Sequence, residues 1–149
     1  MVTRVDRLEP DWKWIDRAQK AGKTVKSFSK WEVRTWGPSP TGKSTKHYVY
    51  AVLLYYPEFP HHPDRFGIYV GMSHLRPPQR LRNHRIGNQA NEDVRRYGVR
   101  LLQHVYQHLN PMRLQEAKLK ERELYDVLKA SELGWVSMGH LRPPPVPAI

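Results

Sequence analysis

A stretch of helical periodicity near the end of the chain is interrupted by one acidic residue. The apolar residues of segment 114–128 fall three or four positions apart, on one face of a helix: Leu114, Ala117, Leu124 and Leu128. Glu121 occupies the remaining position of this face. A carboxylate turned toward a core is costly unless a cation, a metal ion or strong donors compensate for it. Glu121 is therefore the first candidate for a functional residue, and a structural ion pair with an arginine is the alternative.

The chain is strongly basic. Its 149 residues include 25 Lys or Arg and 14 Asp or Glu, which gives a net charge of +11. A domain with this balance usually binds a polyanion, so we expect DNA as the partner, with RNA not excluded. A basic surface without such a partner is the alternative. The chain has no cysteine, which excludes disulfides, thiolate zinc sites and a cysteine nucleophile.

The length predicts one domain with an extension at each end. We expect a basic N-terminal arm over residues 1–46, a core over 47–140 and a Pro-rich tail over 141–149. No apolar run could span a membrane and no apolar signal segment is visible, so we expect a cytoplasmic protein without a membrane partner. The tryptophans of the arm, at 12, 14, 31 and 36, either contact nucleic acid or fold back onto the core. Residues 31–36 are predicted to form a short strand.

Several strands and helices are predicted in the core. Residues 47–56 and 66–72 are rich in aromatic and β-branched residues, and their short connection favours an antiparallel hairpin. Helices are predicted over 77–86, ended by Gly87, over a short stretch between the N-cap Asn91 and Gly98, and over 113–130. Residues 99–109 have helical spacing, and 135–138 are expected to form a short edge strand.

Candidate site residues lie on the predicted hairpin and on the helix after it. Tyr48 and Tyr50 share one face of the first strand, because they are two positions apart. Arg80 and His84 share one face of the helix, because they are four apart. Gly71 removes a side chain where a ligand or another backbone approaches closely.

Two other patterns are weaker candidates. Residues 37–44 match the phosphate-binding P-loop pattern, but a strand rather than a helix is predicted to follow them, and two prolines remove amide donors. The pair His61-His62, with Asp64 nearby, and the pair His104 and His108 could suggest zinc, but neither pair has a further ligand at a spacing that matches a zinc site. We therefore expect neither an NTPase nor a zinc site.

The candidate residues together resemble the GIY-YIG nuclease family. Residues 48–50, Tyr-Val-Tyr, resemble its first signature with Tyr50 at the tyrosine, and residues 69–71, Tyr-Val-Gly, resemble its second with Tyr69 at the tyrosine. Arg80 and His84 match the arginine and histidine of the following helix. Residues 117–124 resemble the segment that carries the metal-binding glutamate, here Glu121. The resemblance covers residues 47–130.

The chain also departs from the family pattern. Tyr48 replaces the first glycine, and residues 57–65 lengthen the connection between the signatures. No asparagine follows Glu121, and His140 is a candidate for that role.

The resemblance implies an α+β fold with a small three-stranded antiparallel sheet flanked by helices, with its third strand around residues 100–106. It also implies metal-dependent hydrolysis of a DNA phosphodiester. Tyr50 would be the general base, Tyr69 would position water or phosphate, and Arg80 would stabilise the charge on the phosphoryl oxygens. His84 would hydrogen-bond the base tyrosine or the phosphate.

The implied cofactor is Mg²⁺ or Mn²⁺, held by Glu121 through oxygen. The cations expected to grip the nucleic acid backbone are Lys43, Lys46, Arg76, Arg82 and Arg85. The alternative function is a nucleic-acid-binding module without catalysis on a degenerate nuclease fold. The intact set of candidate site residues favours the endonuclease, because a carboxylate repels phosphate unless a metal lies between them.

Overall fold

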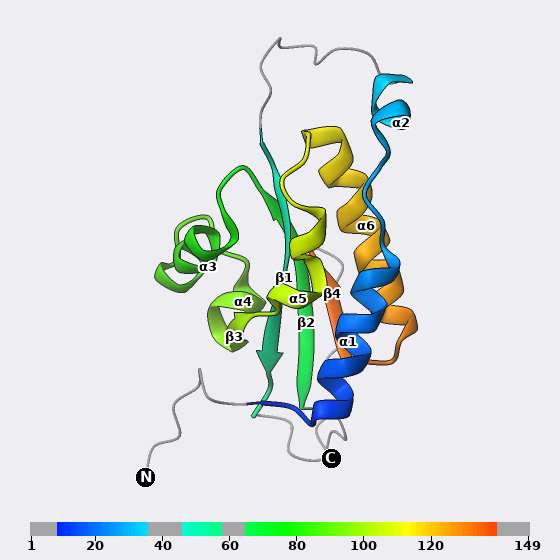
Figure 1. Ribbon diagram of the computed structural model, residues 1–149. Coiled ribbons are helices and arrows are strands. Elements are labelled where there is room, and N and C mark those ends of the chain that lie inside the picture. The colour runs from blue at the N-terminus through cyan, green and yellow to red at the C-terminus, as the bar shows by residue number, and fades with distance from the viewer. Residues whose placement is uncertain (1–8, 36–45, 58–64, 140–149) are drawn as a thin grey trace.

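The fold is α+β, with a four-stranded mixed sheet and helices on both of its faces (Figure 1). This computed structural model describes residues 9–35, 46–57 and 65–139. Its elements are α1 (Trp12–Thr24), α2 (Lys30–Thr35), β1 (Tyr48–Tyr55), β2 (Phe66–Ser73), α3 (Pro77–Ile86), α4 (Glu92–Tyr97), β3 (Gly98–Leu101), α5 (Gln103–Tyr106), the 3₁₀ turn Gln107–Leu109, α6 (Leu114–Ala130) and β4 (Trp135–Met138).

The predicted three-stranded antiparallel sheet is wrong. The strand order is β3-β1-β2-β4, and β1 is antiparallel to both of its neighbours, but β4 runs parallel to β2. Helix α6 explains the added strand, because it packs against β2 and β4 and returns the chain to the beginning of β2, where Gly67 pairs with Trp135. The last strand then enters in the same direction as β2, as a helical connection allows. The predicted edge position of residues 135–138 is confirmed.

The third strand is shorter and earlier than the predicted 100–106. It spans Gly98–Leu101, and the helical spacing that follows it belongs to α5 and the 3₁₀ turn. The chain stays beside β1 after it leaves the strand, because the Leu102 N–H donates to the Ala51 carbonyl at 2.9 Å. Residues 98–106 thus contain a short strand followed directly by a short helix, and the sequence patterns of the two elements overlap there.

The other predicted elements of the core are confirmed, with shifts of one residue at some ends. β1 and β2 form the hairpin, and α3 ends at Gly87, whose φ of 82° is the left-handed conformation that favours glycine. The Asn91 side chain accepts hydrogen bonds from the N–H groups of Asp93 and Val94 and so begins α4. Helix α6 has its buried face at Ala117, Leu124 and Leu128, whereas Leu114 is exposed.

Part of the N-terminal segment belongs to the core. In α1, Trp14 and Ala18 are buried, and the Trp14 indole N–H donates to the Leu133 carbonyl at 3.2 Å. Trp12 and Trp31 are 72 % and 73 % exposed, so of these three tryptophans one folds back and two face solvent. Trp36 lies outside the described residues.

The strand predicted over residues 31–36 is wrong, because α2 covers its described part. The Ser29 hydroxyl accepts from the Glu32 N–H, and the Glu32 carboxylate accepts from the Ser29 N–H, both at 3.1 Å. This reciprocal pair is a capping box, which favours the start of a helix over a strand.

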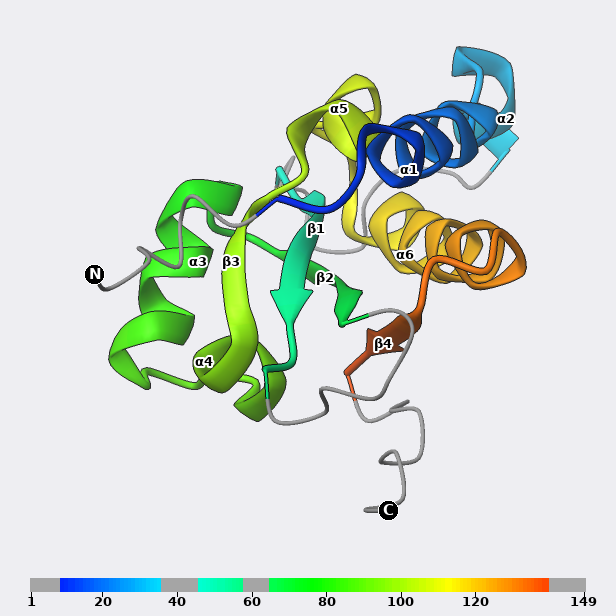
Figure 2. The same cartoon turned by 90° about the horizontal axis from the view of Figure 1, so that it is seen from below.

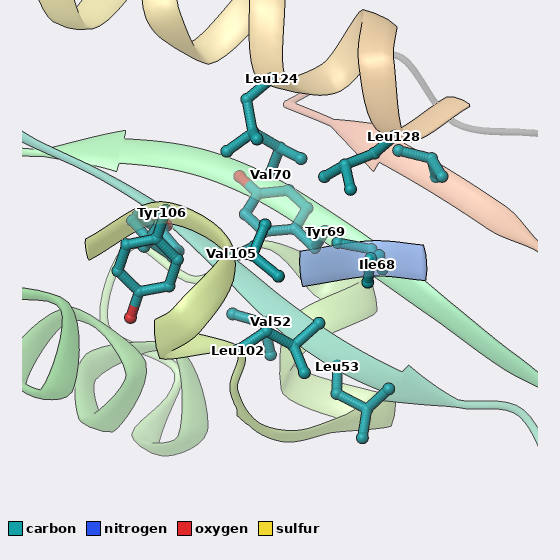
Figure 3. Close-up of a cluster of buried hydrophobic side chains, with 14 of the residues drawn as sticks. Val52, Leu53, Ile68, Tyr69, Val70, Leu102, Val105, Tyr106, Leu124 and Leu128 are labelled. Carbon is teal, nitrogen blue, oxygen red and sulfur yellow. The ribbon is translucent and has the colours of Figure 1, made fainter. Parts of the chain in front are cut away.

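The helices divide between the two faces of the sheet (Figure 2). Helices α3 and α4 contact β1 and β3, and on this side the ring of Tyr56, the residue that follows β1, lies 4.6 Å from the tilted ring of Tyr97 of α4. Helices α1, α5 and α6 lie on the other side, with Leu124 and Leu128 of α6 near Ile68 and Val70 in the close-up (Figure 3). Within the described part of the chain, no helix is long and apolar enough to cross a membrane.

The tight contact between α1 and α5 gives a test of this arrangement. A Cβ on Gly22 would lie 2.2 Å from the Val105 carbonyl oxygen, which is backbone and cannot rotate away. We expect Gly22→Ala to force α1 from α5 and to cost about 1–3 kcal/mol of unfolding free energy, measured by chemical denaturation. Lys23→Ala, an exposed change in the same turn, should stay within about 0.5 kcal/mol. Equal stability of the two variants would contradict the contact.

Candidate active site

Five candidate residues from four elements converge at one place. Tyr50 of β1, Tyr69 of β2 and His84 of α3 form a cluster in which the ring centroids lie 6.1 Å (Tyr50–Tyr69), 6.1 Å (Tyr50–His84) and 5.9 Å (Tyr69–His84) apart. The charges of Arg80 on α3 and Glu121 on α6 both act on the two tyrosines. The structure therefore brings together the five residues that the sequence analysis gave as catalytic candidates: Tyr50, Tyr69, Arg80, His84 and Glu121.

Gly71 makes room for the Tyr50 ring. The two residues are direct cross-strand partners, and a Cβ on Gly71 would lie 2.6 Å from both Cζ and Oη of Tyr50. Such contacts are far inside van der Waals distance. The close approach predicted at Gly71 exists, but the approaching group is the Tyr50 side chain rather than a ligand or another backbone.

Hydrogen bonds on both ring nitrogens set the tautomer of His84. Its Nδ1 accepts the Asn91 backbone N–H at 2.9 Å, and its Nε2 lies 2.9 Å from the Tyr50 hydroxyl oxygen. In the neutral ring, a nitrogen that accepts carries no proton, so the proton is on Nε2 and is donated to Tyr50. The Tyr50 O–H is then free to donate to a different group.

His84 is neutral at physiological pH. Burial, followed by the positive charge of Arg80, lowers the pKa of the imidazole to about 4. The residue is completely shielded from solvent. His84 therefore serves as a fixed hydrogen-bond donor to Tyr50 and does not add positive charge to the site.

Arg80 is held in place by backbone carbonyls beyond the end of its helix. Its Nη2 donates to the Gln89 carbonyl at 2.8 Å and its Nη1 to the Asn88 carbonyl at 3.4 Å. Its charge lowers the pKa of Tyr50 and of Tyr69, and it also hydrogen-bonds Tyr50. A guanidinium fixed in this way can present its remaining donors to a phosphate oxygen.

Both tyrosines are neutral phenols in this environment. Burial raises the pKa of Tyr50 above its ordinary value, and the neighbouring Tyr69 adds to the shift, while Arg80 partly opposes it. Burial and then the Glu121 charge raise the pKa of Tyr69. Ionisation of either hydroxyl at neutral pH would need further positive charge near the site.

Glu121 is half-buried without a compensating partner. Burial raises the pKa of its carboxyl to about 7. Its carboxylate makes no hydrogen bond or ion pair with any residue that the structure describes, so the structural ion pair considered above is not seen there. The nearby Lys120 pairs with Glu123 instead, at 2.9 Å. A carboxylate in this state can bind a proton or a cation.

The described residues contain no group of three or more His, Cys, Asp or Glu side chains that could enclose a metal. His104 and His108, one of the weak zinc candidates, are instead hydrogen-bonded to Gln107 and to the Val25 carbonyl. The P-loop-like residues 37–44 and the His61, His62 and Asp64 group lie outside the described residues. An unpartnered carboxylate fits Mg²⁺, which commonly takes one or two protein carboxylates and keeps several waters.

The sequence analysis missed the part that two residues play in the site. Asn91 was predicted only as a helix cap, but its N–H orients His84 and its Nδ2 donates to the Gly139 carbonyl at 3.3 Å. The Gly139 backbone also hydrogen-bonds Tyr69 and lowers its pKa. Only the cap motif signalled Asn91, and no sequence signal linked Gly139 to the site. His140, the candidate for the missing asparagine, lies outside the described residues.

The cations predicted to bind the nucleic acid backbone differ in their hydrogen bonding to the rest of the protein. Lys46, Arg76 and Arg82 are exposed. Arg85 donates to the Val99 carbonyl at 2.5 Å, so its guanidinium ties α3 to β3. Lys43 lies outside the described residues.

The chain was compared with family models, with curated proteins and with solved structures, and none of them matches it.

The contact between Gly71 and Tyr50 is open to a direct test. We expect Gly71→Ala to displace the Tyr50 ring and to break its hydrogen bond to His84, because the added Cβ cannot share the space. The His84 ring would then shift its NMR signals. Gly87→Ala is a useful comparison, since a Cβ there meets nothing within 4 Å. Its only effect is the backbone strain of placing alanine at a φ of 82°. Unchanged His84 signals in Gly71→Ala would contradict the proposed packing.

The raised pKa of Glu121 predicts how stability depends on pH. The folded state binds this proton more tightly than the unfolded state, so the contribution is complete below about pH 4.5 and is lost as pH rises through 7. We expect Glu121→Gln to have the higher Tm at pH 8 in EDTA, and the difference to vanish near pH 5. A difference of about 1 kcal/mol in unfolding free energy between the two proteins would shift Tm by roughly 2–4 °C.

Asp126→Asn, on the exposed face of the same helix, is the control and should show no such pH-dependent gain. If Glu121→Gln and the wild type kept the same Tm difference from pH 5 to pH 8, the raised pKa would be refuted.

Proposed function

We propose that the protein is a metal-dependent endonuclease of the GIY-YIG type that hydrolyses phosphodiester bonds in DNA. The observation that carries the proposal is the half-buried, unpartnered Glu121 carboxylate beside Tyr50, Tyr69 and Arg80. A protein that only binds nucleic acid gains nothing from such a group, since it repels phosphate. A divalent cation bound to the carboxylate would remove that repulsion. Cation binding would also explain why a carboxylate is half-buried there at a cost in free energy.

The protein groups suit the parts of such a reaction. Arg80 would stabilise the negative charge that develops on the phosphoryl oxygens. Tyr50 would take the proton of the attacking water once its own proton has left, and the donors on its oxygen, Arg80 and His84, stabilise the tyrosinate. Tyr69, hydrogen-bonded to Tyr50, would position the water or the phosphate.

Glu121 would hold Mg²⁺ or Mn²⁺ through a carboxylate oxygen, with water and substrate oxygens as further ligands. When bound, the ion supplies Lewis-acid stabilisation of the phosphoryl group and the positive charge that favours ionised Tyr50. Because its pKa is about 7, Glu121 must lose a proton to bind the ion near neutral pH. Metal affinity should therefore increase as pH rises through this value.

The decisive experiment is a cleavage assay on plasmid and oligonucleotide DNA with Mg²⁺, Mn²⁺ or EDTA. We expect metal-dependent cutting in the wild type, with a loss of about 10²-fold or more in Tyr50→Phe and in Glu121→Gln, while DNA binding is retained. Tyr55→Phe is the matched control. Tyr55 lies on the opposite face of β1 from Tyr50, so this variant should cut DNA at the wild-type rate.

The results separate the two candidate functions. Cutting by Tyr50→Phe at the wild-type rate would remove Tyr50 from the mechanism. No cutting by the wild type with any metal, together with salt-dependent DNA binding, would refute the nuclease and leave a nucleic-acid-binding module.

A further inference from the structure

A pocket of about 420 Å³ opens next to the proposed active site. It lies between the beginning of β1, the beginning of α3 and α5, and its lining includes Tyr48, Arg76 and Tyr106. Tyr48 is two positions before Tyr50 on the same face of β1, and Arg76 is one helical turn before Arg80. The pocket is therefore a direct continuation of the site along both elements. Its volume is in the range of pockets that hold small organic ligands.

Tyr106 contributes a buried ring and an unpartnered hydroxyl. The residue is 3 % exposed, and its hydroxyl makes no hydrogen bond with any described residue. The hydroxyl is not sealed from solvent either, because among described residues only Ser137 has a fully buried side-chain oxygen without a partner. Figure 3 shows the Tyr106 oxygen pointing away from Val52 and Leu102. Tyr106 is one of the residues that line the pocket.

The amides of the lining are not equivalent. Asn110 is occupied, since its side chain both donates to and accepts from the Val49 backbone, at 2.7 and 2.9 Å. The Gln107 amide contacts His104 at 3.2 Å. Gln103 is exposed, and its side chain has no hydrogen bond with the described part of the protein. Gln103 therefore offers the pocket one donor group and one acceptor group.

Two cations complete the lining. Lys46 and Arg76 are exposed, and neither forms an ion pair with a described residue. An inorganic anion would use these cations but leave the Tyr48 ring and the Gln103 amide without a partner. A purely apolar ligand would use the Tyr48 ring but leave the Tyr106 hydroxyl and the cations unmatched. A nucleotide carries a flat ring, a polar base edge and a phosphate, and so matches all three kinds of group.

We propose that this pocket holds one unstacked nucleotide of the substrate strand, next to the phosphate that is cut. Its base lies against the ring of Tyr48, its polar edge meets Gln103 and the Tyr106 hydroxyl, and its phosphate meets Lys46 and Arg76. This inference rests on the proposed nuclease function and specifies how that site selects its substrate. A strand with an unpaired or easily unpaired nucleotide at this position would be preferred, because less unstacking is required.

The test is an NMR titration of the full chain in EDTA with thymidine monophosphate and, separately, with deoxyribose 5-phosphate. We expect the nucleotide to shift the Gln103 side-chain amide and the Tyr106 ring signals, and the sugar phosphate to leave both unmoved. Tyr106→Phe and Gln103→Leu should each weaken nucleotide binding about 3–10-fold, the usual effect of one lost hydrogen bond. Tyr55→Phe and Gln115→Leu, the same changes elsewhere, should bind like the wild type.

Three results would overturn the inference: no shift of the pocket signals by the nucleotide, the same shifts with deoxyribose 5-phosphate, or equal affinities of pocket and control variants. The readout does not depend on cleavage. Nucleotide binding in the pocket by a protein that cuts no DNA would refute the nuclease and keep the nucleotide site. Cutting without nucleotide binding would refute the site and keep the nuclease.

Discussion

The antiparallel pairing of β1 with β2 is the constraint on which the site depends. β1 is a central strand, bonded to β2 on one side and β3 on the other, and its residues alternate between two covered faces. One face meets α3 and α4, and the other meets α5 and α6. A register shift of one residue would exchange the faces and turn Tyr50 away from His84. The pairing of Tyr50 with Gly71 reinforces this register, because only glycine leaves room for the tyrosine ring.

The environment of the site disfavours the ionised forms of Tyr50, Glu121 and His84, because burial shifts the pKa of each group toward its neutral form. Burial keeps Tyr50 protonated, Glu121 near the midpoint of its titration at neutral pH, and His84 uncharged. Arg80 is the permanent charge among them, and backbone carbonyls hold it in place. A divalent cation bound by Glu121 would stabilise the ionised form of both Glu121 and Tyr50. In the proposed nuclease, this coupling would make metal affinity and activity depend on pH together.

Much of the core could be predicted from residue patterns, and the failures have specific causes. Caps and breakers placed the ends of α3 and α4, since Gly87 and Asn91 act through local backbone chemistry. The strand that the family resemblance implied around residues 100–106 was placed too late, because the strand Gly98–Leu101 is only four residues long and a short helix follows it within the same window. The expectation of an antiparallel sheet failed because the direction of β4 depends on how α6 packs, which involves residues far apart in the chain.

The sequence by itself determined the hairpin and the helix faces, because spacing and turn chemistry are local properties, and its resemblance to the GIY-YIG family supplied the set of five candidate residues. Glu121 was identified by its position on an apolar face, without knowledge of its neighbours. Only the tertiary structure decided that the five residues meet, that Asn91 orients His84, and that Glu121 has no partner among the described residues. Those facts depend on burial and on contacts between elements distant in sequence, and no local pattern encodes either.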